Sequence, residues 1–321
     1  MMNYLSKLVK NKKQLGYYII FLPVKIFRKY FNWYFDKKIK NLKFKNNVFS
    51  DVNDILILSS FRVNSEERYD IMNETLRLTL NKFDNDHSSR IEIIDSSDDN
   101  FFERNKTFFS KILKNNNNFK LEKKKARLPQ SYYDTLSSAK EQYFCTFFDD
   151  QPILGINQDF LFSAASLLRD YSSLIDIILF EYPANLSIDD EKRKVFINFR
   201  NIEFKTKNIE PIKVVKYGEY AFALLRNCHY GFFFNNMIGR CDDYSTRLSW
   251  YMNHIDKNSP HEIELAGMRK IGPIFNHIAI PLDVLMVDFD YVHTDIAIRE
   301  SGDKNKFLFQ SIKNGYEFVL Q

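Results

Sequence analysis

Short apolar runs alternate with amphipathic segments over residues 54–181 of this chain. The apolar runs are typical of strands buried on both faces, and they cover residues 54–60, 91–95, 143–148 and 174–181. Between them, residues 65–83 carry apolar residues at helical spacing and residues 159–171 are amphipathic, so both predict helices; residues 101–114 predict another helix, and residues 128–140 a loop and helix. Strands that alternate with helices predict an α/β domain with a mainly parallel sheet and right-handed crossovers.

Local signals also mark the start of the first of these helices. Ser65 is a suitable N-cap, because its side chain can accept a hydrogen bond from a free backbone N–H of the first turn. Glu66 and Glu67 suit the positive end of the helix dipole. The sequence therefore predicts that this helix begins directly after Ser65.

The composition is that of a folded protein without a cysteine-based metal site. Of the 321 residues, 45% are hydrophobic, which is enough for one large domain or two small ones. The three cysteines lack zinc-site spacing and indicate reduced thiols in a cytosolic setting. The chain has nine glycines and contains neither GxGxxG nor GxxxxGK followed by serine or threonine. Dinucleotide-binding and P-loop functions therefore lose their main support.

Positive charge is concentrated at the start of the chain. Residues 1–50 contain 12 basic residues and one acidic residue, whereas the remaining 271 contain 34 basic and 40 acidic residues. A basic head on a mildly acidic body predicts that the head alone meets an anionic surface. It also argues against a body that binds nucleic acid.

The basic head has the pattern of a segment that lies on a membrane surface. Its apolar run, residues 15–24, is too short for a spanning helix of about 20 residues and lacks a signal-peptide cleavage pattern. Cations then interleave with Tyr30, Phe31, Trp33, Tyr34 and Phe35, as suits an anionic headgroup layer. We expect residues 1–48 to be a basic amphipathic segment, peripheral at the cytoplasmic, inner face of the membrane. A helical arm that packs on the body and a nucleic-acid-binding arm are the alternatives.

Polar residues follow three of the predicted strands. They are residues 59–62, residues 95–98 and the pair Asp149–Asp150. The carboxyl ends of parallel strands meet at one edge of a sheet, where open α/β sheets bind ligands. Adjacent carboxylates there suit a divalent metal that holds a phosphorylated substrate. A solvated acidic turn is the alternative interpretation.

This series of strand ends resembles the nucleotide-sugar domain of GT-A glycosyltransferases, especially those of family 2. Glu67-Arg68 and Thr75-Leu76 stand in places similar to the Glu-Arg and Thr-Leu of that family's first helix. Residues 94–99 (IDSSDD) are similar to its V-D-x-x-S-x-D motif, and residues 148–151 (FDDQ) to its DxD-type motif. The resemblance covers residues 53–185. It departs from the family at Gln151, where the motif often has its last acid, and in the first loop, which lacks the usual proline.

The resemblance implies a GT-A-like catalytic domain over residues 49–321, with a nucleotide-sugar half (49–185) and an acceptor half (186–321). Asp149 and Asp150 would hold Mn²⁺ or Mg²⁺ on the diphosphate of the donor. Asp95, together with Ser97, would bind the base or ribose of the nucleotide. A carboxylate can accept hydrogen bonds from a ribose hydroxyl. It is also common as a turn or N-cap residue, which is the alternative.

Further candidates come from residues outside these motifs. Arg62 and Arg299 could pair with the diphosphate, or be surface cations. Glu262 and Glu264 match the place of the general base in GT-A enzymes, with Glu264 preferred, or they complement a helix dipole. His293 is the best of the six histidines for the late metal or diphosphate ligand of some GT-A enzymes, or it is structural.

Residues 227–251 combine aromatic side chains with the acidic pair Asp242–Asp243. Aromatic rings can cover the apolar face of a sugar while carboxylates bind its hydroxyls, so this segment suits a sugar site. Core aromatics beside a solvated acidic turn are the alternative.

The most favoured function is therefore a membrane-associated glycosyltransferase of polysaccharide biosynthesis. It would move a sugar from a nucleotide-sugar donor to a glycan or lipid-linked acceptor, with inversion implied by the family resemblance. One alternative is a nucleotidyltransferase, although no glycine-rich phosphate loop is present. The other is an inactive, membrane-docked carbohydrate-binding or scaffold protein, which Gln151 in the acidic motif favours.

Overall fold

The structure is a computed structural model of the 321-residue chain. It describes residues 33–34, 36–41, 54–83, 89–125, 128–180, 185–198, 211–226, 236–254, 277–291 and 296–320. The chain divides into two compact units, Met1–Lys43 and Phe44–Gln321. The domain boundaries expected after residues 48 and 185 stay predictions.

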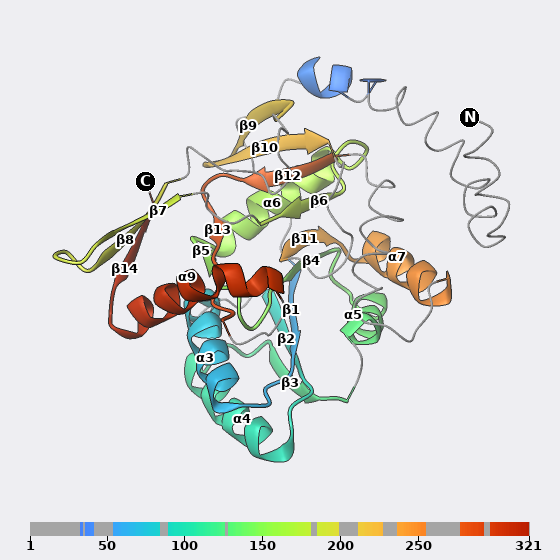
Figure 1. Cartoon of the computed structure of the whole chain (residues 1–321). Helices are drawn as coiled ribbons and strands as arrows, with labels where there is room; N and C mark the ends of the chain where they lie inside the picture. Colours follow the sequence, from blue (N-terminus) through green and yellow to red (C-terminus); the bar gives the residue numbers. More distant parts are fainter. Residues whose placement is uncertain are drawn as a thin grey trace, which may run out of the picture. The chain divides into compact units, whose positions relative to one another are not determined.

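A mixed sheet of nine strands, counted over the described residues, forms the second unit's framework (Figure 1). From edge to edge its strands are β3 (Phe119–Lys123), β2 (Ser89–Asp95), β1 (Ile55–Phe61), β4 (Tyr143–Thr146), β11 (Met237–Arg240), β6 (Ile177–Leu179), β12 (His277–Pro281), β10 (Tyr220–Arg226) and β9 (Lys213–Tyr217). Only β11 and β10 run against the other seven. The predicted α/β class with a mainly parallel sheet is therefore confirmed.

Helices cover both faces of this sheet (Figure 1). On one face α3 (Glu66–Leu80), which the short 3-10 helix η1 (Asn81–Phe83) extends, contacts α4 (Asp99–Ile112). On the other face α5 (Leu128–Ser137) contacts α7 (Cys241–His254). In addition, α6 (Gln158–Asp170) packs on β6, β9 and β11, and α9 (Ile296–Lys313) packs on α3.

The strands and helices predicted over residues 54–181 are all present, with ends that differ by a few residues. The Ser65 side chain accepts a hydrogen bond from the Arg68 N–H over 3.2 Å, which confirms the predicted N-cap of α3. Two strands in this region were not predicted, β3 and β5 (Ile153–Leu154). β3 is a half-exposed edge strand and β5 has only two residues, so neither contains an apolar run long enough to mark it.

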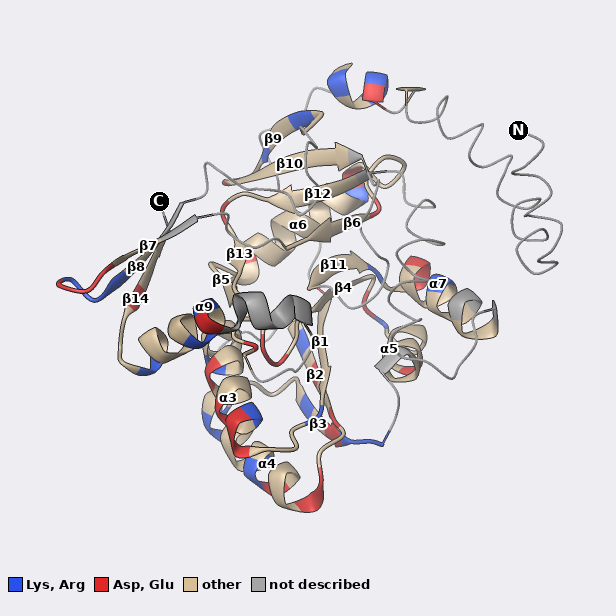
Figure 2. Cartoon of the chain, in the orientation of Figure 1, with Lys and Arg blue, Asp and Glu red and all other residues tan. Residues whose placement is uncertain are grey.

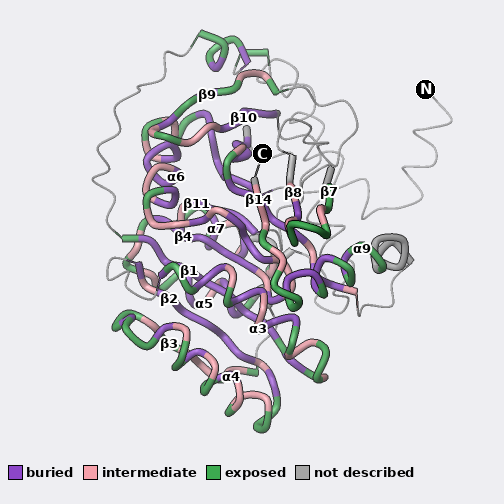
Figure 3. Tube along the Cα trace, turned by 90° about the vertical axis from the view of Figure 1, so that its left-hand side faces the viewer, coloured by how far each residue is buried: buried purple, intermediate pink, exposed green. Residues whose placement is uncertain are grey.

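The core of the second unit is built on the central strands (Figure 3). All seven residues of β1 are buried, which explains why its sequence is apolar almost throughout. Side chains of α5 and α7 pack over the same strands, including Tyr132 and Tyr244. Gly239 of β11 lies against the ring of Phe144, and a Cβ atom there would be 2.9 Å from that ring. Only glycine fits at this position without a shift of the ring.

A smaller apolar cluster joins α3, α9 and the residues around β13 (Leu285–Met286). Ile71 of α3 packs there with Phe289 and Phe309. β13 pairs antiparallel with β5. Three further strands form a separate small sheet in the order β14 (Glu317–Leu320), β8 (Lys194–Asn198), β7 (Asn185–Asp189). The pairing of β5 with β13 brings residues 285–290 beside the loop that follows β4.

Acidic and basic residues are interspersed along the outer surfaces of α3 and α4 (Figure 2). Arg104 of α4 donates two hydrogen bonds to the Glu66 carboxylate, over 2.6 and 2.8 Å, and its guanidinium lies 3.9 Å from the centre of the Tyr69 ring. Exposed pairs of this kind contribute about 0–1 kcal/mol each. These contacts connect α3 and α4 and do not indicate a binding site.

In the first unit, residues 33–34 and 36–41 are helical. The Trp33 side chain is 57% exposed and Tyr34 is 39% exposed. The Lys37 ammonium lies 5.5 Å from the centre of the Trp33 ring, and that of Lys38 lies 4.7 Å from the Tyr34 ring. Within the part of the chain that the structure describes, none of the helices combines the length and the apolar character needed to cross a membrane.

Candidate functional site

The order of the parallel strands creates a switch point beside the acidic pair. After β1 the chain adds β2 and β3 on one side, and then returns to add β4 on the other side. Open α/β sheets bind ligands outside the carboxyl ends of the strands at such a point. Asp149 and Asp150 follow β4 after two further apolar residues. The structure thus places them where this class of sheet binds its ligands.

The loop that carries the acidic pair is held from both sides by Asn236, which is fully buried. Its Oδ1 accepts a hydrogen bond from the Phe148 N–H over 2.8 Å, and its Nδ2 donates to the Gln151 carbonyl over 3.1 Å. The Ser59 hydroxyl of β1 donates to the Phe147 carbonyl over 2.9 Å. The backbone on each side of Asp149 and Asp150 is therefore fixed. This role of Asn236 was not predicted, because its only signal in the sequence is an amide next to the apolar residues of β11.

Two further carboxylates reach the acidic pair through the β5–β13 pairing. Beyond β13 the Val287 N–H donates to the Pro152 carbonyl over 3.1 Å, and the Phe289 N–H donates to the Asp150 carbonyl over 2.9 Å. This pairing places Asp288 and Asp290 beside Asp150. Both were missed from the sequence, where their only signal is alternation with apolar residues just after residues 284–287.

The side chain of Arg68 lies at the centre of these carboxylates. Its Nη2 is 2.8 Å from Asp149 Oδ2, and its Nη1 is 3.2 Å from Asp150 Oδ2 and 3.5 Å from Asp290 Oδ1. The Arg68 side chain is 11% exposed, and the three carboxylates are between 9% and 14% exposed. We call Arg68, Asp149, Asp150, Asp288 and Asp290 the acidic cluster.

Negative charge exceeds positive charge in this cluster. Burial, and then the neighbouring Asp149 carboxylate, raise the pKa of Asp150 to about 8. Burial likewise raises the pKa of Asp149, although Arg68 opposes this. Burial alone lowers the pKa of Arg68, but the three carboxylates more than offset it, so its pKa is raised and the guanidinium stays charged. One arginine thus faces more carboxylates than it neutralises.

We expect the metal-free protein to lose stability between about pH 4 and pH 8 because of Asp150. Its pKa is about 8 in the folded protein and about 4 in an unfolded chain, so the folded state binds an extra proton within this window. A carboxyl group whose pKa is raised by folding therefore destabilises the fold progressively as the pH rises. Urea unfolding of the wild type and of Asp150→Asn should show similar midpoints near pH 4 and a more stable variant near pH 8. A difference that does not change with pH would contradict this assignment.

The donor atoms of the cluster fit a hard divalent cation, although they are not arranged around one. Among the described residues, no three histidine, cysteine, aspartate or glutamate side chains converge in a way that could hold a metal ion. Carboxylate oxygens are nevertheless the donors that Mg²⁺ and similar ions prefer. The guanidinium of Arg68 already lies between Asp149 and Asp150, where it supplies the positive charge that a metal ion would otherwise supply.

Asp95 and Ser97 lie at the end of β2 and organise the backbone around them. Asp95 is fully buried, and its Oδ1 accepts from the Ser97 N–H over 2.8 Å while its Oδ2 accepts from Asn105 Nδ2 over 2.6 Å. The Ser97 hydroxyl accepts from the Val63 N–H over 2.8 Å. These contacts join the ends of β1 and β2, so Asp95 has the structural role of a turn residue. Nucleotide binding by Asp95 and Ser97 stays a prediction.

The remaining predicted site residues are described only in part. Arg62 follows β1 and is exposed. Arg299 lies in the first part of α9, residues 296–302, for which the structure describes the backbone alone. Glu262, Glu264 and His293 lie outside the described residues. Their predicted roles as base and metal ligand stay predictions.

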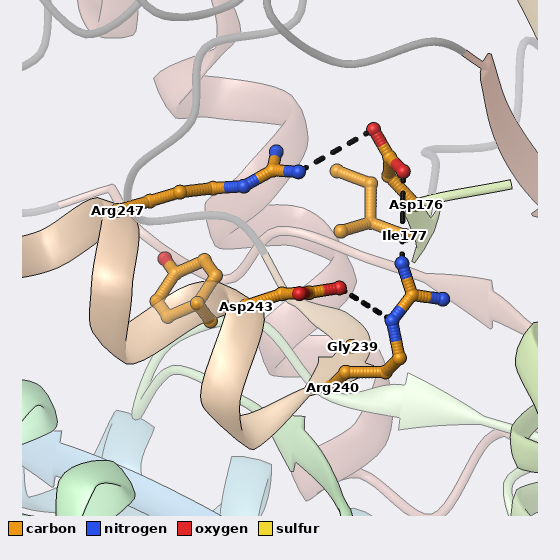
Figure 4. A pocket seen from close by; sticks show the side chains of 7 residues that line it. Asp176, Ile177, Gly239, Arg240, Asp243 and Arg247 are labelled. Atoms are coloured by element: carbon orange, nitrogen blue, oxygen red, sulfur yellow. Dashed lines mark hydrogen bonds and ion pairs between the residues drawn. The ribbon is translucent and has the colours of Figure 1, made fainter. Parts of the chain in front are cut away.

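The acidic segment at the start of α7 lies near the amino end of β4, at the opposite end of that strand from Asp149. Arg240 pairs in register with Tyr143, at the amino end of β4, whereas Asp149 follows its carboxyl end. Arg240 forms ion pairs with Asp243 and Asp176, and Arg247 forms one with Asp176 over 3.5 Å, around a small pocket (Figure 4). The sugar site that residues 227–251 suggest is therefore not joined to Asp149 and Asp150 through Asp243, which instead pairs within this network.

No protein-family model and no curated protein matches this chain. Residues 1–349 of S. aureus TarS are similar to it at 11% identity, with a TM-score of 0.38 and coverage of 71% of this chain and 57% of that one. The same protein in complex with UDP has 12% identity, a TM-score of 0.35 and the same coverage. A cytidylyltransferase from Leptospira borgpetersenii has 12% identity, a TM-score of 0.33 and coverage of 66% and 68%. The chain thus spans less than two thirds of the TarS 1–349 chain, and its fold class rests on its own sheet.

Proposed function

We propose that this chain is a glycosyltransferase with a GT-A-like domain that uses a nucleotide-sugar donor. The observation that carries the proposal is the buried pair Asp149–Asp150 at the switch point of the sheet, paired with Arg68. A surplus of buried negative charge at the ligand-binding edge suits a diphosphate that arrives with a divalent cation. Because S. aureus TarS has been solved in complex with UDP, UDP is the first nucleotide to test.

In this proposal Asp149 and Asp150 hold Mn²⁺ or Mg²⁺, with His293 as a further ligand. The bound metal would neutralise charge on the diphosphate leaving group. Asp95 and Ser97 bind the nucleoside, and Arg62 and Arg299 pair with the diphosphate. Glu264, or else Glu262, takes the proton from the hydroxyl of a glycan or lipid-linked acceptor, as inversion by a single displacement requires.

The proposal is tested by thermal unfolding of the full chain with nucleotides and metal. A ligand at 100 times its dissociation constant stabilises the folded state by about 2.7 kcal/mol, which is measurable as a rise in Tm. UDP and other nucleoside diphosphates, with Mn²⁺ or Mg²⁺, should raise the Tm more than either component alone. No rise with any of these ligands would refute the proposal. Release of pyrophosphate from a nucleoside triphosphate and a sugar phosphate would instead indicate a nucleotidyltransferase.

We also propose that residues 1–48 attach the protein to the inner, cytoplasmic face of a membrane. The exposed Trp33 and Tyr34 rings with Lys37 and Lys38 beside them support this, because such pairs suit an anionic headgroup layer. Deletion of residues 1–48 should abolish sedimentation of the protein with vesicles that contain anionic lipid. At low salt the full chain should bind these vesicles and should not bind vesicles made of neutral lipid alone. Binding that survives the deletion would contradict the proposal.

A further inference from the structure

Arg68 stands at an unusual place for a cation. It is the third residue of α3, in the first turn, where the helix dipole disfavours positive charge by roughly 0.3–1 kcal/mol. Its side chain nevertheless points its guanidinium into the acidic cluster and is 11% exposed. Helix stability therefore does not explain an arginine at this position. The carboxylates that surround it do.

The contacts of Arg68 are those that a bound metal would need. Its two terminal nitrogens lie on Asp149 Oδ2 and Asp150 Oδ2, over 2.8 and 3.2 Å. Mg²⁺ binds carboxylate oxygens at about 2.0–2.1 Å, so on the same two carboxylates it would draw on the negative charge that holds the guanidinium. Charge repulsion between the two cations in a buried setting acts in the same direction. Arg68 and a divalent cation therefore compete for the same pair of carboxylates.

We propose that Arg68 is an exchangeable counter-ion that couples metal binding to diphosphate binding; this inference rests on the function proposed above. Without ligands, Arg68 is paired with Asp149 and Asp150. When metal and nucleoside diphosphate bind together, Arg68 gives up these carboxylates and pairs with diphosphate oxygens, for which a guanidinium is well suited. Arg68 is thus a positioning residue that makes metal alone a poor ligand and the metal–diphosphate pair a good one.

Coupling of this kind is reciprocal. If the diphosphate gives Arg68 a new partner, it raises the affinity for metal, and metal raises the affinity for the diphosphate by the same factor. Coupled sites typically change each other's affinity by roughly 5- to 150-fold. Removing the arginine should therefore shift the two affinities in opposite directions. A residue that only stabilises the fold does not produce that pattern.

The test measures Mn²⁺ binding by electron paramagnetic resonance and UDP binding by calorimetry, on the full chain. In Arg68→Gln the affinity for Mn²⁺ alone should rise about tenfold, because no cation competes, and the affinity for UDP at saturating Mn²⁺ should fall about tenfold. Arg68→Lys keeps the charge and should change both affinities less, and in the same directions. Arg77→Gln on the exposed side of α3, where Arg77 pairs with Glu74, should match the wild type in both measurements.

The outcomes separate this inference from the function on which it rests. If wild type binds Mn²⁺ with UDP, but Arg68→Lys and any folded Arg68→Gln bind Mn²⁺ alone no more tightly, the counter-ion role is wrong and the proposed function stands. If wild type binds neither Mn²⁺ nor UDP, both fail. Should Arg68→Gln be unfolded without metal, added Mn²⁺ is expected to restore its thermal transition. If Arg68→Gln does not fold, the Mn²⁺ affinity of Arg68→Lys is compared with that of the wild type instead.

Discussion

Replacing Asp149 with asparagine is expected to abolish metal-supported nucleotide binding while the protein remains folded. The substitution removes one of the two carboxylates on Arg68 Nη1 and Nη2, and leaves a neutral amide of the same shape. Transfer of sugar from the donor should fall by about 100- to 1,000-fold, the loss typical when one electrostatic stabiliser of a transition state is removed. Binding is measured by calorimetry with UDP and Mn²⁺, and activity by release of the nucleoside diphosphate.

The fold should survive because the acidic cluster has more negative than positive charge. After Asp149→Asn, Arg68 keeps the carboxylates of Asp150 and Asp290, at 3.2 and 3.5 Å. The matched control is Asp159→Asn, which changes an exposed carboxylate in the first turn of α6 and should leave nucleotide binding unchanged. A variant Asp149→Asn that binds UDP and Mn²⁺ as the wild type does would remove the acidic pair from the proposed site.

Replacing Arg68 with methionine is expected to lower the free energy of unfolding by about 3–5 kcal/mol in metal-free buffer at neutral pH. The aliphatic part of the side chain is retained, but the buried carboxylates of Asp149, Asp150 and Asp290 lose their counter-ion. An uncompensated buried charge costs more than the lost ion pair contributes. Urea unfolding measures the change.

Two comparisons identify the cause of this loss. In an Asp290→Asn background the cost of Arg68→Met should be smaller, because one of the carboxylates that face Arg68 is already absent. Arg77→Met, on the same helix with its side chain 46% exposed and paired with Glu74, should change stability by less than about 1 kcal/mol. Equal losses for Arg68→Met and Arg77→Met would show that the acidic cluster does not depend on its arginine.

Much of the framework was predictable because its signals are local. The apolar run of β1 and the helical spacing of α3 both lie within single segments, and Ser65 marks where α3 begins. Asp149 and Asp150 were also singled out, since they directly follow the apolar run of residues 143–148. Their position at the sheet edge follows from strand direction alone, once the sheet is mainly parallel.

The partners of the acidic pair were not predictable in the same way. Asp288 and Asp290 arrive through two-residue strands, β5 and β13, which lack a periodic signal and pair across more than a hundred residues. Asn236 looks like one amide in an aromatic segment, yet its hydrogen bonds fix the loop on both sides of Asp149. Such contacts depend on how distant segments pack, which no local pattern records.

The sequence by itself determined the α/β class, the alternation of strands and helices, and the acidic pair at a strand end, because each depends on neighbouring residues and on the periods of helix and strand. Only the tertiary structure decided that Arg68 meets Asp149 and Asp150, and that two further aspartates join them. The physical reason is that folding brings charges from α3, from the loop after β4 and from the chain after β13 into one buried place. Water screens charges weakly there, so the strength of their interaction depends on their distance in three dimensions.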